Sequence, residues 1–176
     1  LEPVNIGGVL VSNATLHNFD EIEKKDIRKN DIVEIQRAGD VIPQVIKVLS
    51  QSKDRSKTIT TPKVCPSCKG YTLKEKDEAV LRCINFHNCE AQIIGQIVHF
   101  VSKKSFNIEG FGEKQVNQLY QLRLIRKISD IFEIYKYKKE IINLDGWGEL
   151  SFNNLIKAIN NSKNITLDKF IYSLGI

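Results

Sequence analysis

The sequence contains no methionine, one tryptophan and four prolines among its 176 residues. It also lacks any apolar run near the roughly 18 residues that a membrane-spanning helix needs, which excludes a transmembrane protein. Residues 1–4 show neither the basic nor the apolar region of a secretory signal. Because a complete translation product begins with methionine, we expect a chain cut from a longer protein. The remaining composition, with 41% hydrophobic and 27% charged residues, is that of a folded globular protein.

Familiar catalytic motifs are also missing. A nucleotidyl-lysine enzyme needs the sequence Lys-x-Asp-Gly, and the nearest match, residues 143–146, has asparagine in place of the lysine. The sequence has no Walker A lysine and no recognisable nucleophilic triad. His17 stands alone, which is more typical of a structural histidine than of a catalytic one. We therefore expect the chain to perform no chemistry by itself.

The cysteines, in contrast, are concentrated in one short segment. Their pattern is Cys-x2-Cys, then 14 residues, then Cys-x5-Cys. Two such arms joined by a hairpin can place four thiolates around one Zn²⁺ ion. Two disulfides or four buried thiols are the alternatives, although nothing in the sequence indicates the secretion that favours disulfides. The predicted zinc ligands are Cys65, Cys68, Cys83 and Cys89.

A zinc ion held by four thiolates has no open position for water, so we predict a structural role and no catalytic one. His87 lies within the second arm, but with four sulfurs available it is predicted to be a surface residue. Residues 62–90 contain few large apolar side chains, so metal binding must supply much of the free energy that folds them.

Residues 1–61 have the patterns of β-strands. Runs at residues 8–12, 32–36 and 41–49 are apolar, β-branched or alternating, and Asn18 is a suitable N-cap for a short helix between the first two. Several short strands with one helix predict a small, mostly antiparallel barrel. Arg37 lies in the expected turn between two of these strands, where binding residues often gather.

The apolar period becomes helical over residues 93–176. The last 86 residues hold 12 of the 26 basic residues against eight acidic ones, and so most of the net charge of +5. Residues 108–113 recur 36 positions later as residues 144–149, each copy reading apolar, acidic, Gly, aromatic, Gly, Glu. A repeat of this kind between helical segments indicates two related turns.

Two glycines in such a turn permit positive φ angles and a close backbone approach. The N–H groups that begin the next helix can then face a phosphate oxygen, aided by the helix dipole. Such contacts carry no base information, so the pattern predicts sequence-independent DNA binding, with ordinary glycine-capped turns as the alternative. The aromatic residue of each copy is expected to pack under its turn. The predicted phosphate contacts are Gly110, Gly112, Gly146 and Gly148.

These motifs, in this order, resemble the bacterial NAD-dependent DNA ligases over essentially the whole chain. The resemblance is carried by residues 1–4, 11–18 and 36–43, the four cysteines ending in residues 89–92, residues 99–102 and the two glycine turns. It implies a multidomain α+β protein. The expected parts are an OB-fold domain over residues 1–61, a four-cysteine zinc finger over 62–92 and an all-α helix-hairpin-helix domain over 93–176. The family's barrel has earlier strands and its helical domain has further hairpins, so both parts are expected to be incomplete.

The resemblance also implies a function. The family joins a 3′-hydroxyl to a 5′-phosphate at a nick in double-stranded DNA during replication and repair, with NAD as adenylate donor and Mg²⁺ as a further cofactor. The lysine nucleophile and the NAD site of the family are expected outside this chain. The chain itself would then be a non-catalytic DNA clamp. Arg37, Val41 and Ile42 match positions near the minor groove around the nick. We expect a monomer in the bacterial cytoplasm, associated with the nucleoid and not with a membrane.

Two other functions stay open. A stand-alone zinc-containing DNA-binding module of another repair protein, such as a single-strand-binding barrel with a zinc ribbon, would expose stacking aromatics on its barrel. Residues 1–61 contain one aromatic residue, Phe19, which argues against that function. A zinc-dependent interaction module that binds no nucleic acid is the third possibility. Competition between nicked, intact and single-stranded DNA separates the three.

Overall fold

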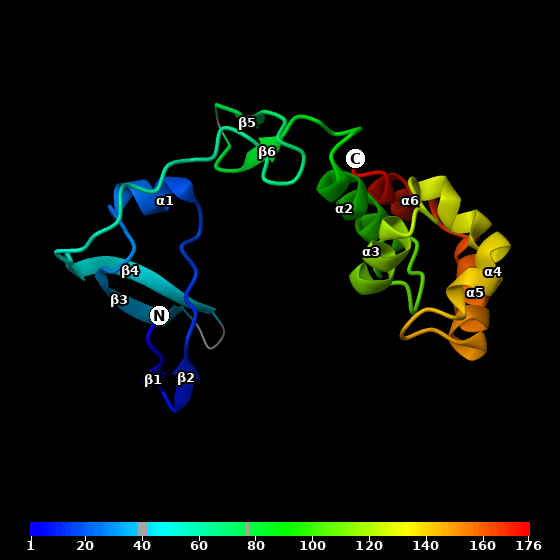
Figure 1. Ribbon diagram of the computed structural model, residues 1–176, viewed down its shortest axis with the longest axis horizontal. Coiled ribbons are helices and arrows are strands. Elements are labelled where there is room, and N and C mark those ends of the chain that lie inside the picture. Colours follow the sequence, from blue (N-terminus) through cyan, green and yellow to red (C-terminus); the bar gives the residue numbers. More distant parts are fainter. Residues whose placement is uncertain (39–41, 77) are drawn as a thin grey trace. The chain divides into compact units, whose positions relative to one another are not determined.

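The computed structural model describes residues 1–38, 42–76 and 78–176. The described chain forms two compact units, shown with their elements in Figure 1: the first unit is residues 1–65 with 71–84, and the second is residues 66–70 with 85–176. Within the described residues, no helix has both the length and the apolar character that crossing a bilayer requires.

The first unit opens with a short hairpin. Strand β1 (Val4–Ile6) pairs antiparallel with β2 (Val9–Val11). Gly7 and Gly8 connect them with φ angles of 59° and 82°. A two-residue turn of this type requires positive φ at both positions, which glycine adopts without strain. The Gly-Gly pair therefore forms the turn between the two strands.

A longer antiparallel hairpin follows, made of β3 (Ile32–Ala38) and β4 (Ile42–Ser50). Thr15 adds a parallel bridge to the other edge of β4, because its N–H donates to the Pro43 carbonyl at 2.8 Å and its carbonyl accepts from Val45 N at 3.2 Å. Within the described residues, the strands pair two by two into separate sheets. The predicted strands are present, and these pairings by themselves do not close a barrel.

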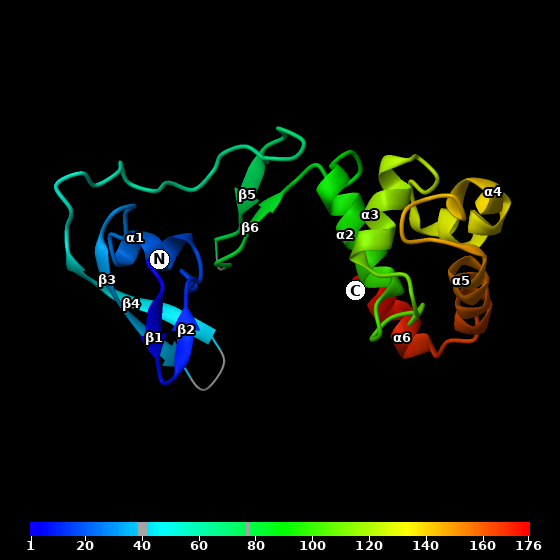
Figure 2. The same ribbon diagram turned by 60° about the horizontal axis from the view of Figure 1, so that its bottom comes forward.

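Helix α1 (Phe19–Lys24) lies beside the β3–β4 hairpin in both views (Figures 1 and 2). It begins where predicted, because the Asn18 side chain accepts a hydrogen bond from Glu21 N at 2.9 Å. The buried core of this part is small and consists of Ile22, Ile27 and Val45, with partly buried neighbours around them. Residues 1–61 thus fold around few apolar side chains.

An ion pair fixes the chain that follows the hairpin. Arg55 donates to both carboxylate oxygens of Asp31 at 2.8 and 2.9 Å and to the Asp26 carbonyl at 2.6 Å. The Asp31 side chain is fully buried and that of Arg55 is 13% exposed. The hydrogen bonds from Arg55 hold the pKa of the Asp31 carboxyl below its usual range, although burial acts in the opposite direction. This pair is a polar anchor of residues 51–57.

The segment between the two cysteine pairs is a third hairpin, as the spacing predicted. Strands β5 (Thr72–Lys74) and β6 (Leu81–Cys83) pair antiparallel. The residues that precede β5 join this hairpin through a bridge between Val64 and Tyr71. Several large apolar residues here stay exposed, including Tyr71 at 75%.

The second unit is helical, which confirms the change of period seen in the sequence (Figure 2). Its elements are α2 (Glu90–Val101), α3 (Glu113–Gln121), the 3₁₀ helix η1 (Ile128–Tyr137), α4 (Lys138–Ile141), α5 (Glu149–Ser162) and α6 (Leu167–Ser173). One glycine turn lies between α2 and α3, and the other lies between α4 and α5.

A single apolar core joins α2, α3, η1, α4 and α5. Residues at helical spacing point into it, such as Val116 and Leu119 of α3, which are completely buried, and Phe152, Leu155 and Ile159 of α5. The 3₁₀ helix contributes Ile131 and Ile134, three residues apart, in agreement with the three-residue turn of that helix. The helical unit therefore has the extended apolar core that the first unit lacks.

Candidate metal centre and nucleic-acid interface

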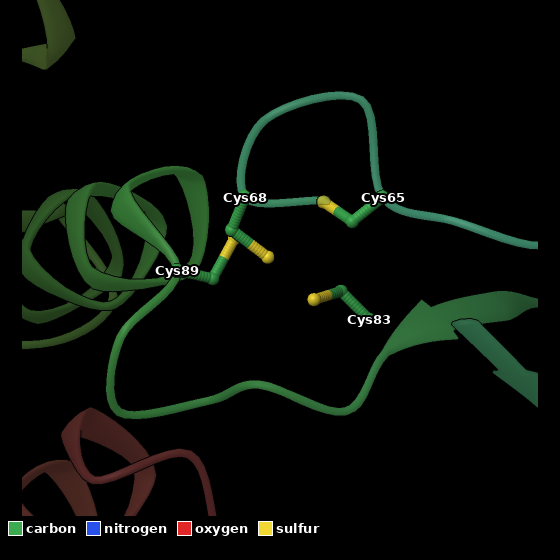
Figure 3. A group of neighbouring side chains, drawn as sticks. All are labelled: Cys65, Cys68, Cys83 and Cys89. Atoms are coloured by element: carbon green, nitrogen blue, oxygen red, sulfur yellow. The ribbon is translucent and has the colours of Figure 1, made fainter. Parts of the chain in front are cut away.

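The four predicted zinc ligands lie together. The Sγ atoms of Cys65, Cys68, Cys83 and Cys89 are all within 4.8 Å of one another, and Figure 3 shows them directed toward a common centre. Three of these cysteines are buried and Cys68 is half-buried. Zinc–sulfur bonds of about 2.3 Å in a tetrahedron put the sulfurs roughly 3.8 Å apart. The cluster therefore needs only a small adjustment to hold one zinc ion.

The backbone around Cys68 shows why the first arm folds as a tight knuckle. Lys69 has a left-handed φ of 60°, and the following Gly70 N–H donates to Cys68 Sγ at 3.4 Å. A Cβ added to Gly70 would lie 3.2 Å from Asn85 Cβ and 3.3 Å from Cys68 Sγ. An added Cβ would thus be crowded here, and the backbone N–H of Gly70 approaches a ligand sulfur.

The two cysteines of the second arm lie at the ends of two regular elements. Cys83 is the last residue of β6, and Cys89 is the N-cap of α2. The positive end of the α2 dipole favours a negatively charged ligand such as a thiolate at that position. His87 is exposed and stands outside the four-sulfur cluster, as predicted.

The donor set determines what a metal can do at this centre. Soft sulfur ligands in a tetrahedral arrangement suit Zn²⁺. Four protein ligands fill the coordination sphere, so the centre can stabilise the fold and has no position at which to activate water. The residues present therefore fit a structural zinc ion.

The two glycine turns share one backbone geometry. Gly110 and Gly146 have φ angles of 77° and 78°. In each copy the aromatic residue's N–H donates to the carbonyl three residues earlier, at 3.3 Å to Ile108 and at 3.0 Å to Leu144. A turn with positive φ at its third residue strongly favours glycine there. The repeat seen in the sequence is therefore a structural repeat as well.

The second glycine of each turn has a different role. Gly112 and Gly148 are the N-caps of α3 and α5, with φ angles of −90° and −177°, in the extended region open to any residue. A Cβ on Gly148 would meet no atom within 4 Å, and one on Gly112 would meet only Gln115 Oε1 at 3.6 Å. Neither the conformation nor the internal packing of the protein requires glycine at these positions.

The aromatic residues pack as expected. Phe111 is 2% exposed within the helical core, and Trp147 is half-buried against it. The Trp147 indole N–H donates to Gln118 Oε1 at 2.7 Å, and Gln118 Nε2 donates to the Asp145 carbonyl at 3.2 Å. Gln118 of α3 thus holds the second turn in place. The sequence pattern did not indicate this residue, since its partner lies 29 positions away.

Of the three residues expected near the nick, the structure describes two, Arg37 and Ile42. Arg37 lies within β3 opposite Pro43, so the expectation that it sits in a turn is wrong; the pairing of Ala38 with Ile42 extends the strand beyond it. Ile42 is the first residue of β4 and is 58% exposed. Val41 is outside the described residues. Contact of these residues with DNA stays a prediction.

Comparison with known proteins agrees with these features. Residues 1–57 match the NAD-dependent DNA ligase OB-fold domain, and residues 64–91 match the NAD-dependent DNA ligase C4 zinc finger domain. The chain is 52% identical to a DNA ligase of Pelagibacter ubique over 184 residues, 49% identical to one of Wolbachia pipientis wMel over 180 residues and 44% identical to one of Gluconobacter oxydans over 176 residues.

Each of these alignments includes 100% of this chain and 26 or 27% of the relative. The chain therefore contains an OB-fold domain and a C4 zinc finger, and the domain models that define both are specific to one kind of enzyme. Both domains are those of NAD-dependent DNA ligases, and the whole chain aligns with proteins named DNA ligase, as the resemblance predicted. The chain spans about a quarter of the length of the curated relatives that it matches.

Proposed function

We propose that this chain is the DNA-clamping part of an NAD-dependent DNA ligase, which joins a 3′-hydroxyl to a 5′-phosphate at nicks in duplex DNA during replication and repair. The observation that carries the proposal is the pair of matched glycine turns, each placed before a helix N-terminus. We divide the chain into an OB-fold domain over residues 1–61, a zinc finger over 62–92 and a helix-hairpin-helix domain over 93–176.

The phosphate grip is assigned to the second unit. The first N–H groups of a helix have no partner within the helix, and the helix dipole attracts an anion to that end. Glycine at positions 112 and 148 places no Cβ of its own between the first turn of α3 or α5 and a phosphodiester. Because packing and conformation do not demand glycine there, close approach by a ligand explains it. Gly110 and Gly146 supply the turns that aim these helix ends.

The OB-fold domain is assigned to the nick. Arg37, Val41 and Ile42 would lie near the minor groove there. The position of Ile42, exposed at the start of β4, supports this assignment. A complete barrel in the whole protein would add strands to the two hairpins described here.

Catalysis is assigned to another part of the protein. The sequence contains no Lys-x-Asp-Gly motif, so we propose that the adenylated lysine, NAD and Mg²⁺ belong outside this chain. Zn²⁺ held by Cys65, Cys68, Cys83 and Cys89 would have a structural role only. The whole enzyme would act as a monomer in the bacterial cytoplasm, associated with the nucleoid.

The alternative of a single-strand-binding module is disfavoured by the distribution of aromatics. Phe19, the one aromatic residue of residues 1–61, is half-buried and packs against the small core of the first unit. It is therefore poorly placed to stack on a base.

The test compares Gly112→Ala and Gly148→Ala with Gly95→Ala, whose added Cβ on α2 would meet open space. All three variants should fold as the parent chain does. We expect the first two to bind nicked duplex roughly tenfold more weakly in fluorescence anisotropy, because a methyl group would separate the helix end from the phosphate. Gly95→Ala should bind as the parent does.

Binding should also weaken steeply as salt rises, because phosphate contacts release counterions. Nicked duplex should compete better than intact duplex, and single strands worst. Equal binding by all three glycine variants would overturn the phosphate assignment, and preference for single strands would favour the alternative module.

A further inference from the structure

His17 and its partner Gln44 form a feature of the N-terminal unit that the function proposed above does not use. The imidazole Nε2 lies 2.7 Å from Gln44 Oε1, across 27 residues of sequence, and it is the donor because an amide oxygen can only accept. His17 also has a φ angle of 62°, in the left-handed region that residues with a side chain occupy uncommonly. Such a conformation persists only where surrounding contacts hold it, and it is often found at functional sites.

The contacts that hold His17 come from the edge of β4. Thr15 is bonded to both sides of Gln44, through the Pro43 carbonyl and the Val45 N–H. Its Oγ1 then accepts the His17 N–H at 3.0 Å, which turns the chain and brings the imidazole over β4. The left-handed turn therefore serves to place this side chain on Gln44.

Gln44 lies on the face of β4 that carries Ile42. Residues two apart on a strand share a face and are separated by about 7 Å. Val45 points to the opposite side, into the core of the unit. Gln36 is the cross-strand partner of Gln44, so the face next to Ile42 is polar. An exposed apolar residue beside an oriented amide is an arrangement suited to the edge of a nucleic-acid groove.

The hydrogen bond decides which half of the amide is presented. A glutamine side chain carries a carbonyl acceptor and an NH₂ group with two donors. Because the imidazole N–H engages the carbonyl oxygen, the NH₂ group is the half directed away from His17. The minor groove offers acceptors at every base pair, and only guanine adds a donor, its N2 amino group. A donor-only amide can therefore bind any sequence in that groove.

We propose that Gln44 is a further DNA-contacting residue that donates to minor-groove acceptors beside the nick, and that His17 is its positioning residue. This inference rests on the proposed function, since it requires the Ile42 face to meet DNA. His17 makes the contact tolerant of sequence by keeping the amide from turning over. The ligand class is duplex DNA, recognised through the O2 and N3 atoms of its bases.

The experiment measures binding of the zinc-loaded chain to nicked duplex. Gln44→Leu removes the amide and keeps a similar volume. His17→Gly removes the imidazole and relieves the left-handed backbone, since glycine adopts it without strain. Gln36→Leu is the matched control on the neighbouring strand. We expect Gln44→Leu to weaken binding roughly fivefold, in the range of one hydrogen bond, with a smaller loss for His17→Gly.

Two readouts distinguish positioning from a general structural role. The double variant should bind as Gln44→Leu does, because His17 acts only through Gln44. Replacing guanine by inosine next to the nick removes only the N2 amino group. The guanine-to-inosine affinity ratio should therefore be higher for His17→Gly than for the parent chain, because its amide can turn and accept from guanine.

Failure of the two proposals can be told apart. If the parent chain does not bind duplex DNA, the proposed function fails. If it binds while Gln44→Leu binds equally well, or while the guanine-to-inosine ratio is unchanged in His17→Gly, this inference alone is overturned. Should His17→Gly unfold, His17→Asn serves in its place, because asparagine tolerates the left-handed region and lacks the imidazole.

Discussion

The segment of residues 62–90 and the helical residues 93–162 are stabilised in opposite ways. In the helical region a continuous core of buried Ile, Leu, Val and Phe side chains extends from Ile97 to Ile159. Among the described residues of 62–90, the buried side chains are the cysteines 65, 83 and 89, while Tyr71, Leu73 and Phe86 are exposed. One region folds by removing apolar surface from water, and the other depends on bonds to a metal.

Metal removal should give the largest difference between the two regions. A chelator that strips Zn²⁺ should abolish amide hydrogen-exchange protection over residues 62–90, where metal binding is worth about 10–16 kcal/mol in comparable fingers. Protection in α3 and α5 should persist, because their core contains no ligand to the metal. The single tryptophan, Trp147, reports on the helical region by its fluorescence. Unchanged hydrogen-exchange protection of residues 62–90 after metal removal would contradict the claim that this segment depends on the metal.

Truncating the apolar core should have the converse effect. Leu155→Ala empties a site that is 2% exposed, and we expect a loss of about 2–5 kcal/mol in the free energy of unfolding followed by Trp147 fluorescence. Zinc affinity should be unchanged. Leu150→Ala, at a position 76% exposed on the same helix, is the matched control and should change stability by less than about 0.5 kcal/mol. Equal effects of the two variants would contradict this assignment of the core.

Gly70→Ala tests how closely zinc affinity depends on the turn beside Cys68. The added Cβ would crowd Cys68 Sγ and Asn85, so we expect zinc affinity to fall about tenfold, near 1.4 kcal/mol, as for other changes beside metal ligands. Competition with a chromogenic chelator measures this. Gly95→Ala on α2 should leave zinc affinity unchanged, since its Cβ meets open space. A normal zinc affinity for Gly70→Ala would show that the knuckle tolerates a wider turn.

Acid should lower the stability of the first unit through its carboxylates, with a smaller effect than the changes above. The pKa values of Asp31 and Asp26 are lowered, chiefly by hydrogen bonds from Arg55 and Arg28 respectively. A lowered pKa in the folded state contributes stability that is complete above the ordinary value near 3.8 and is lost as pH falls through the lowered one. NMR-detected urea unfolding between pH 6 and pH 3 should therefore show this unit losing stability.

Arg55→Met is the control for that titration. It should flatten the acid dependence of the first unit, since Asp31 would no longer have its main partner. An equally steep loss of stability in the variant would assign the acid sensitivity to other carboxylates.

Local rules predicted the elements of this protein well. The Gly7-Gly8 turn, the Asn18 cap, the hairpin between the cysteine pairs and the two glycine turns all follow from residues adjacent in sequence, whose conformations are set by sterics and short hydrogen bonds. The metal cluster also followed from spacing, because a Cys-x2-Cys knuckle has few ways to orient its sulfurs. The end of β3 was missed, since cross-strand pairing and not local propensity carries Arg37 into the strand.

What the sequence alone determined is therefore the zinc ligand set, the helical repeat and the family resemblance that the comparisons confirm. The tertiary structure decided how distant side chains meet: Arg55 on Asp31, Gln118 on the second glycine turn, and His17 on Gln44. No periodicity marks these residues, because a hydrogen bond between distant positions depends on where the backbone brings two side chains together. Spacing reveals chemistry only when the ligands share one short stretch of chain.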